Sequence, residues 1–493
     1  MLRIMTRLNK DDLAQMNEDY FESLDQKRLV QVAKNLHLLA IEQWEKINSD
    51  SGNSSQPPSS DNPFKKQHQK SSFQEKQTKE SKPKRKPGRQ KGSKGFGRSQ
   101  ILKVDKIIPH YPERCSACNQ ASMTYETKSY TGHQVLELEK TELGLKIACQ
   151  LHHYYQGSCT CGHQSKSKPG EGITSTVEGR TRDLKLTEYV LVGNVLATFI
   201  ASMGVRYRLS RAKIQEFLFD WLGVKLSIGT IDRCVREAGI ACEPVVEELL
   251  AQLQLAEILH VDETPWYQKG KLYWLWVAIS SKIAVFRIAP RTKKEFQQLV
   301  TEAFVGWLIT DGYGAYRHRK KRQRCLAHLI RKAIGISESI NSRTARIGKL
   351  ILGNLRDFIH GIKSGQNRAE LDQIIRSLQG VCHIGKRVVK HDKLKALANE
   401  ILNDWDAVIA AVNNPDLPLT NNEAERALRH AVIARRISYG TRTNEGSIAY
   451  SSLLSVIETC RLRQINPWFY ISEVIKLARK GLSPPPIPIS IVT

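Results

Sequence analysis

The fold of this chain is decided by residues 256–288, which read AEILHVDETPWYQKGKLYWLWVAISSKIAVFRI. A first apolar run closes at Asp262, and runs rich in aromatic and β-branched residues follow at 272–280 and 283–288. Runs of this length and composition, separated by short turns such as the one at Gly270, are typical of β-strands. The stretch therefore predicts a meander of three strands.

A helix and another strand are expected directly after the meander. Residues 292–295, Thr-Lys-Lys-Glu, have the pattern of a capping box, which predicts a helix to about Ala303. The apolar run 306–310 then predicts a strand that closes at Asp311. The order strand-strand-strand-helix-strand is that of an RNase H-like fold, and it places Asp262 and Asp311 at the ends of neighbouring strands. Arg324-Cys325 ends a fifth predicted strand.

A third acid, Glu425, lies in residues 419–429, LTNNEAERALR, which predict a capped helix start. Glu423 has a structural role available, because residues 420–423 fit a capping box. Glu263 is expected on the opposite face of its strand from Asp262. Carboxylates are hard oxygen ligands suited to Mg²⁺ or Mn²⁺, and two such ions can support in-line displacement at phosphorus.

The charge of the chain points to a polyanionic partner. The 493 residues include 75 Lys and Arg against 49 Asp and Glu, a formal charge of +26. Residues 48–104 are poor in apolar side chains and are predicted to be disordered. Within them, residues 82–104 hold nine Lys or Arg and no acid, so they form either a solvated linker or a non-specific phosphate-binding segment. The candidate DNA contacts there are Lys84, Arg85, Lys86 and Arg89.

Residues 105–165 have the cysteine spacing of a small zinc-binding module. Cys115-Ser116-Ala117-Cys118 is a CxxC pair, and Cys159-Thr160-Cys161 supplies a second pair. Four thiolates make the tetrahedral soft-ligand set that Zn²⁺ prefers. Because the second pair has a one-residue spacer, His163 is an alternative fourth ligand, and four reduced thiols without metal remain the other interpretation.

Residues 184–250 are predicted to be helical. Ser210 can cap one helix and Ser227 a second, with a turn between them. The second helix is expected to direct an apolar stripe inward, namely Ile228, Ile231, Cys234 and Val235. Its outward residues are Thr230, Arg233 and Arg236. This arrangement predicts either a helix-turn-helix that contacts DNA or a plain helical hairpin packed on the catalytic domain.

The remaining segments complete a multidomain α/β chain. Residues 1–47 predict a helical segment, 255–480 the RNase H-like domain with a helical insertion at about 338–413, and 481–493 a disordered proline-rich tail. No signal peptide and no apolar run long enough for a membrane span are found in the sequence. The scattered cysteines suit a reducing cytoplasm.

The most specific motifs resemble those of the DDE transposases of bacterial insertion sequences, in particular the insertion-sequence 66 family. The resemblance runs from about residue 85 to about 480. It rests on Val261-Asp262-Glu263-Thr264-Pro265, Thr310-Asp311-Gly312-Tyr313, Asn421-Asn422-Glu423-Ala424-Glu425-Arg426, Cys325-Leu326-Ala327-His328, Ile457-Glu458-Thr459 and Asn466-Pro467-Trp468-Phe469-Tyr470. The family pattern places its third acid directly before the Arg, which selects Glu425.

The resemblance implies metal-dependent cutting at the ends of a mobile element and joining of the freed 3′-OH to target DNA. It implies Asp262, Asp311 and Glu425 as catalytic ligands of Mg²⁺ or Mn²⁺, and a structural Zn²⁺ at the four cysteines. Arg426 is a further candidate phosphate contact. Expected partners are double-stranded DNA at terminal repeats and target, a homo-oligomer on that DNA and accessory proteins of the element, in the bacterial cytoplasm at the nucleoid.

The residues alone support only metal-dependent phosphoryl transfer on nucleic acid. One rival is a DNA-binding protein without catalysis that only occupies terminal repeats. A second rival is an RNase H-like nuclease that cuts DNA without joining it.

Overall fold

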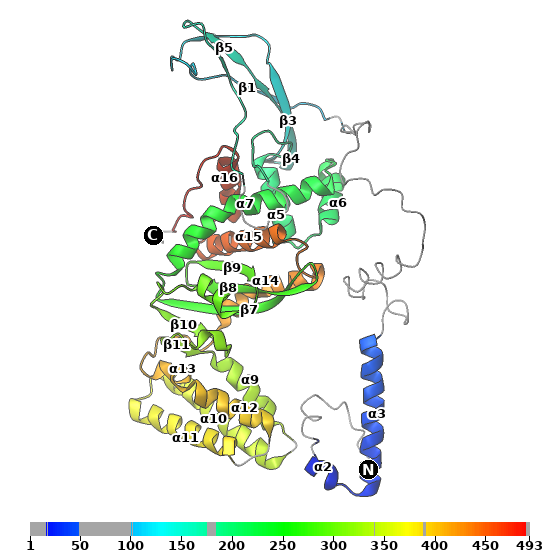
Figure 1. The fold of residues 1–493 in the computed structure, drawn as a ribbon, viewed down its shortest axis with the longest axis vertical. Coiled ribbons are helices and arrows are strands. Elements are labelled where there is room, and N and C mark those ends of the chain that lie inside the picture. Colours follow the sequence, from blue (N-terminus) through cyan, green and yellow to red (C-terminus); the bar gives the residue numbers. More distant parts are fainter. Residues whose placement is uncertain are drawn as a thin grey trace, which may run out of the picture. The chain divides into compact units, whose positions relative to one another are not determined.

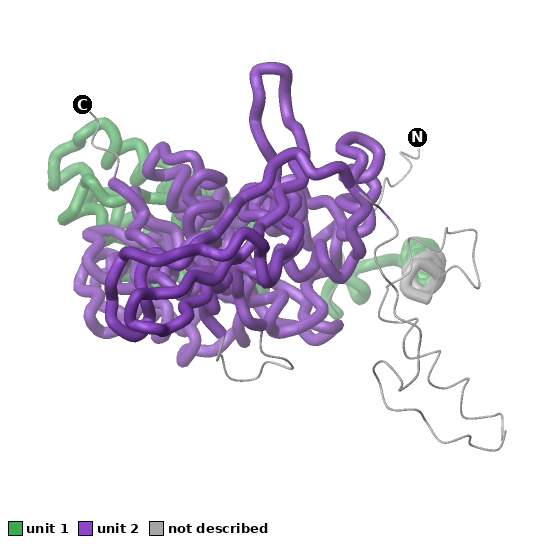
Figure 2. Tube along the Cα trace, turned by 90° about the horizontal axis from the view of Figure 1, so that it is seen from above, with its two compact units in different colours: residues 1–94, 322–420 green, residues 95–321, 421–493 purple. Residues whose placement is uncertain are grey.

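The computed structural model of this chain describes residues 16, 18–48, 100, 102–174, 184–339, 341–387 and 391–489. It divides into two compact units, which Figure 2 colours separately. Unit 1 comprises residues 1–94 and 322–420, and unit 2 comprises 95–321 and 421–493. Each unit has its own apolar core.

Unit 2 begins with two small sheets of three strands each. Their strands are β1 (Lys106–His110), β2 (Met123–Tyr125), β3 (Thr131–Thr141), β4 (Gly144–Tyr154), β5 (Gln156–Cys159) and β6 (Gln164–Lys166). The first sheet has the order β1-β4-β3, with β1 parallel to β4 and β3 antiparallel to it. The second has the order β2-β5-β6 and is antiparallel throughout.

Three helices follow in unit 2: α5 (Asn194–Val205), α6 (Arg211–Leu222) and α7 (Ile228–Leu253). The predicted caps of the last two are confirmed, because the side chain of Ser210 accepts a hydrogen bond from Lys213 and that of Ser227 from Thr230. The predicted inward stripe of α7 is wrong at Ile228, which is 49% exposed. Ile228 is the first residue of the helix and is exposed, whereas Ile231, one turn later, is buried in the core.

The sheet of unit 2 confirms the predicted meander (Figure 1). Its strands are β7 (Ile258–Gln268), β8 (Lys271–Ile279), β9 (Ala284–Ala289) and β10 (Trp307–Thr310). They lie in the order β10-β7-β8-β9, with β7, β8 and β9 antiparallel and β10 parallel to β7. Helix α8 (Lys293–Leu299) connects β9 to β10, and it is shorter than predicted.

The expectation that Asp262 ends its strand is wrong. Strand β7 continues through Asp262 to Gln268 and stays paired with β8 along that length. Pro265 is tolerated within it because β10 pairs with β7 only over residues 258–260, so no ladder bond to β10 is lost at Pro265. Asp262 therefore lies inside a long strand, just past the stretch paired with β10.

The C-terminal helices of unit 2 are α14 (Asn422–Ser438), α15 (Asn444–Leu462) and α16 (Pro467–Arg479). Helix α14 packs on β7 and β8, while α15 packs on β9 and α7. The expected disorder of the proline-rich tail is wrong for residues 481–489. Ile487 is buried and its carbonyl accepts a bond from Arg463, while the Pro485 carbonyl accepts one from Tyr470 at 2.6 Å.

Unit 1 consists of helices and one short strand among its described residues. The elements are α2 (Glu18–Glu22), α3 (Gln26–Asn48), β11 (Arg322–Arg324), α9 (Leu326–Ser337), α10 (Ser342–Ser364), α11 (Arg368–Arg387), α12 (Asp392–Asn403) and α13 (Trp405–Val408), with 3₁₀ turns in both units at Gly314–Tyr316 and Ala410–Val412. Its core is formed by apolar faces of α9 to α12. Across the described residues of both units, every helix is too short or too polar to cross a membrane.

Candidate functional site

Two aspartates meet where β10 leaves the sheet of unit 2. Asp262 lies in β7, and Asp311 follows the last residue of β10. The parallel pairing matches Ile309 with His260. Extending that register by two residues puts Asp311 level with Asp262. The backbone N–H of Tyr313 donates to Oδ1 of Asp311 at 2.9 Å and fixes the side chain in the loop.

Glu425 reaches the same region from α14. It lies in the first turn of the helix, and its backbone N–H donates to the carbonyl of Asn421 at 3.1 Å. Asn421 is fully buried, and its Nδ2 donates to the carbonyl of Val261 at 2.8 Å. Because Val261 directly precedes Asp262, this bond ties the start of α14 to β7 beside the aspartate. The buried side chain of Ala424 packs the same turn inward.

The electrostatics show that the three acids interact. Burial raises the pKa of Asp262 to about 8, and the negative charges of Glu263, Asp311 and Glu425 add to that rise. In the described part of the chain, the ligand atoms of Asp262, Asp311 and Glu425 do not all lie within 4.8 Å of one another. The site is therefore a group of carboxylates whose charges act on Asp262, and it is not a closed cluster.

Glu263, next to Asp262, has partners of its own. Its side chain is buried, forms an ion pair with Arg291 at 2.6 Å and accepts a hydrogen bond from the Tyr316 hydroxyl. The guanidinium of Arg291 also lies 4.1 Å from the centre of the Tyr313 ring. Arg291 follows β9, and no sequence signal marked it.

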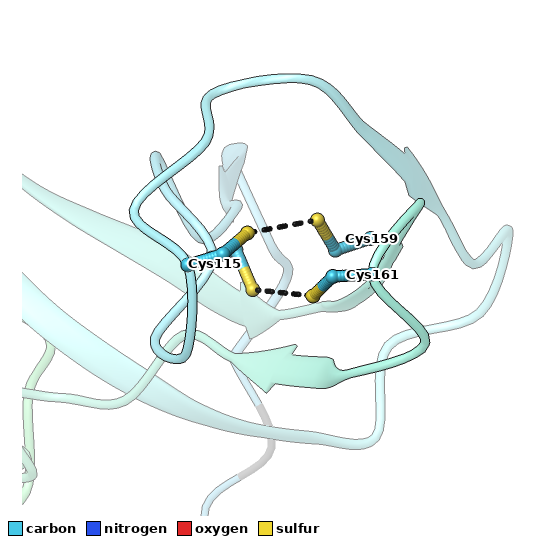
Figure 3. Close-up of side chains that lie close together, drawn as sticks. Cys115, Cys159 and Cys161 are labelled. Carbon is cyan, nitrogen blue, oxygen red and sulfur yellow. Dashed lines mark hydrogen bonds between the residues drawn. The ribbon is translucent and has the colours of Figure 1, made fainter.

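The four cysteines converge in the small sheet β2-β5-β6, as Figure 3 shows. The Sγ atoms of Cys115 and Cys161 are 3.7 Å apart, and those of Cys118 and Cys159 are 3.4 Å apart. Zn²⁺ with ligand bonds of about 2.3 Å separates its tetrahedral sulfurs by about 3.8 Å. The four thiols therefore have the spacing of a group that could bind zinc.

Local backbone geometry supports the thiolate form of Cys115, whereas neighbouring thiols and burial raise the pKa of Cys118 to about 12. The backbone N–H groups of Cys118 and Ala117 point at the sulfur of Cys115 and lower its pKa to about 6. The one-residue spacer of the second pair is accommodated by a turn, in which the N–H of Gly162 donates to the Cys159 carbonyl at 2.9 Å. Replacement of a thiolate by His163 is not what the structure shows, since its Nε2 bonds to the Ser116 hydroxyl at 2.8 Å.

The candidate DNA contacts on α7 differ in their surroundings. Arg233 is exposed, and Thr230 is half-buried with its hydroxyl 2.9 Å from that of Ser227. Arg236 forms an ion pair with Asp232 at 2.9 Å. The contacts named in the basic segment, Lys84, Arg85, Lys86 and Arg89, lie outside the described residues.

Helix α14 presents exposed arginines beside its acid. Arg426, Arg429 and Arg436 are all exposed. The predicted capping box is wrong, because no side chain caps α14 at Asn421. Glu423 instead pairs with Arg426 at 3.4 Å.

A second polar feature beside α14 was missed from the sequence. Burial and the charges of Arg206, Arg208 and Arg429 lower the pKa of His430. Its Nδ1 and the Tyr450 hydroxyl are buried without a hydrogen-bond partner. Arg208 also has a positive φ of 62°, which is unusual for a bulky residue. These groups come from three separate segments, so no local pattern could have joined them.

The fold and its sites define a mixed α/β protein with an acidic group on one sheet and a separate four-cysteine group that could bind zinc. Residues 192–449 match the transposase IS66 family. Because this match covers more than half of the chain, the chain belongs to that family.

Curated relatives come from Sinorhizobium fredii (strain NBRC 101917 / NGR234). The uncharacterized protein y4hP is 25% identical over 394 residues, which is 64% of this chain and 70% of the relative. The uncharacterized protein y4jD is 22% identical over 432 residues, 80% of each chain. The uncharacterized protein y4qI is 23% identical over 304 residues, 54% of this chain and 56% of the relative. Their names assign no activity, so the family match carries the functional information.

Proposed function

We propose that this chain is a catalytically competent DDE transposase whose acids are Asp262, Asp311 and Glu425. The observation that carries the proposal is that the charges of Asp311, directly after β10, and Glu425, in the first turn of α14, both act on the buried Asp262 of β7. Isolated acids at such positions are commonly caps or turn residues. A buried Asp262 that also feels the charges of Asp311 and Glu425 disfavours folding, so a functional reason for this arrangement is needed.

The topology of unit 2 supports an RNase H-like core. An antiparallel meander β7-β8-β9 is followed by a helix and then by β10, parallel to β7 on its other side. Asp262 lies in β7, Asp311 directly follows β10, the strand beside β7, and Glu425 lies on a later helix that packs on β7 and β8. That is the order the RNase H-like prediction requires.

The donor set fits a hard divalent cation. All three donors are carboxylates, and the pKa of Asp262 is raised by burial and by the negative charges around it. Mg²⁺ or Mn²⁺ bound there would activate an attacking oxygen and stabilise a leaving one at phosphorus. Asp262, Asp311 and Glu425 would be its protein ligands. Glu263 is not assigned this role because Arg291 and Tyr316 engage its carboxylate.

The DNA would be held by positive side chains around the acids. Arg426 and Arg429 lie within about one turn of Glu425 on α14 and are exposed. They can bind phosphates near the acids. We assign further contacts to Thr230, Arg233 and Arg236 on α7 and to Lys84, Arg85, Lys86 and Arg89. The substrates would be the ends of the element and target DNA, bound by an oligomer of this chain, with any accessory proteins of the element, in the bacterial cytoplasm.

The four-cysteine group is proposed to hold a structural Zn²⁺. Its four thiols leave no open position for a substrate, as is usual for structural zinc sites. The domain limits expected from the sequence, with a zinc module at 105–165 and a helical insertion at about 338–413, are retained as part of this proposal.

The test is incubation of purified protein with labelled element ends, a target plasmid and Mg²⁺. Cleaved ends joined to plasmid are expected. Cleavage without joining would favour the nuclease, and binding without cleavage would favour the inactive DNA-binding protein.

A further inference from the structure

Asn421 occupies the N-cap position of α14 but does not cap it. An Asn at this position usually accepts a hydrogen bond from a backbone N–H of the first turn, which stabilises a helix by about 1 kcal/mol. In α14 no such side-chain bond is formed. The first turn of α14, which carries Glu425, therefore lacks the stabilising side-chain hydrogen bond that an N-cap Asn usually forms.

The amide of Asn421 is used between elements instead. Its Nδ2 donates to the carbonyl of Val261 at 2.8 Å, and its Oδ1 lies 3.2 Å from Nδ1 of His260. Asn421 is fully buried and His260 is 6% exposed. With both ends of the amide bonded to β7 in a dry place, the side chain has one orientation.

These bonds fix the two acids relative to each other. Val261 immediately precedes Asp262, and the carbonyl of Asn421 accepts the N–H of Glu425. The far end of α14 is tied to the same strand, since Arg435 donates to the Thr264 hydroxyl at 2.9 Å. Helix α14 is thus held to β7 on both sides of Asp262.

We propose that Asn421 is a positioning residue, whose side-chain amide sets the separation of Glu425 from Asp262 and so the affinity of the acid group for a divalent cation. This role rests on the proposed function. Groups that orient metal ligands typically change metal affinity by about 10- to 100-fold when removed, although they never touch the metal.

The variant that separates positioning from stability is Asn421→Ser. A Ser hydroxyl can cap α14, so the thermal midpoint is expected to stay within about 2 °C of wild type. The shorter side chain cannot span to the Val261 carbonyl, so Mn²⁺ affinity is expected to fall about tenfold or more. Calorimetric titration of DNA-free protein with Mn²⁺ measures this. Asn422→Ala, at the exposed next position, is the matched control and should bind Mn²⁺ as wild type does.

Kinetics provide a second readout with the same variant. The Mn²⁺ concentration that half-saturates DNA cleavage should rise about tenfold, while the rate at saturating Mn²⁺ returns most of the way to wild type. If Asn421→Ser folds poorly, Asn421→Ala is titrated below its own thermal midpoint and should show the same loss of affinity.

Wild-type Mn²⁺ affinity in a folded Asn421 variant would overturn the positioning role and leave the proposed function intact. A wild-type protein that binds Mn²⁺ no better than Asp262→Asn does would overturn the proposed function and this role with it.

Discussion

The four-cysteine group and the acid group are both assembled from residues distant in sequence, but they differ in what brings their members together. The thiols lie in the segment before β2 and at the turn from β5 to β6, with sulfur atoms 3.4 and 3.7 Å apart. The carboxylates come from β7, the end of β10 and α14, and burial together with the charges of Glu263, Asp311 and Glu425 raises the pKa of Asp262. The four cysteines are nearly in the geometry of zinc ligands. The acid group places negative charges around the buried Asp262, which a bound cation would neutralise. Sulfur distances that suit zinc therefore distinguish the four-cysteine group from the proposed cation site.

Replacing a single acid is expected to have the largest effect, because it tests whether the three acids form one cation site. Asp262→Asn, Asp311→Asn and Glu425→Gln each keep the side-chain shape and remove one anionic ligand. Each is expected to lower cleavage and joining by roughly 10³-fold or more, with DNA binding largely kept. Gel assays of labelled element ends measure both quantities. Wild-type cleavage by all three variants would show that the acids do not form a shared site.

Replacing two cysteines tests whether the four-cysteine group binds zinc. The double variant Cys118→Ala/Cys159→Ala is expected to reduce bound zinc from about one per chain to none, because two of four ligands are removed. Elemental analysis of purified protein gives the stoichiometry. Cys382→Ala, a buried thiol in unit 1, is the control and should keep its zinc. Wild-type protein without zinc, with all four thiols open to alkylation, would contradict the assignment.

The basic segment tests whether DNA affinity is independent of both groups. Changing Lys84, Arg85, Lys86 and Arg89 together to Ala should weaken binding to all DNA sequences about equally. The slope of log K against log salt should become shallower by about one for each phosphate that the segment no longer neutralises. Fluorescence anisotropy at several salt concentrations measures the slope. A weakening confined to terminal-repeat DNA, with the slope unchanged, would argue against phosphate binding by this segment.

The pH dependence of stability tests whether the pKa of Asp262 is raised in the folded chain. The pKa of Asp262 is about 8 in the folded chain against an ordinary value of 3.8. The folded state therefore binds the proton of the Asp262 carboxyl more tightly than the unfolded state does. The stability that this protonated carboxyl contributes is lost as pH rises from 3.8 through 8. Asn does not titrate, so metal-free Asp262→Asn should become more stable than wild type as pH approaches 8, by about 2 °C in thermal midpoint. If the difference in thermal midpoint between Asp262→Asn and wild type is the same at about pH 5 and at about pH 8, the pKa of Asp262 is not raised in the folded chain.

Glu423→Gln should have the smallest effect. Glu423 is exposed and pairs with Arg426 on the surface, an interaction worth less than about 1 kcal/mol. Cleavage is expected to stay within about threefold of wild type. An inactive Glu423→Gln beside an active Glu425→Gln would reassign the third acid.

Much of the fold was readable because its signals are local. The aromatic and β-branched runs predicted β8 and β9 within one residue at most ends, and Ser210 and Ser227 marked helix starts correctly. Errors arose where the partner of a segment decided its state. Strand β7 continues past Asp262 because β8 pairs with it there, and residues 481–489 are ordered because Ile487 packs into the core of unit 2.

The acids and cysteines of the candidate sites could be predicted from the sequence, but the residues that hydrogen-bond to their surroundings could not. The acids and cysteines were named from spacing and motif, and the cysteines converge as expected. The use of Asn421 was not visible, since the same residues fit a capping box and only the packing of α14 on β7 turns its amide away from the helix. The same holds for Arg291, whose partner Glu263 lies on a different strand.

The central claim, that three acids from separate elements form one cation site, is tested most directly by diffraction. A crystal soaked in Mn²⁺ and measured at the manganese edge locates the ion without reference to activity. An anomalous peak bonded to carboxylate oxygens of Asp262, Asp311 and Glu425 is expected, and it should be absent from Asp262→Asn crystals. Bound manganese elsewhere on the chain, with these three carboxylates free of it at saturating concentration, would show that the acids do not form a cation site.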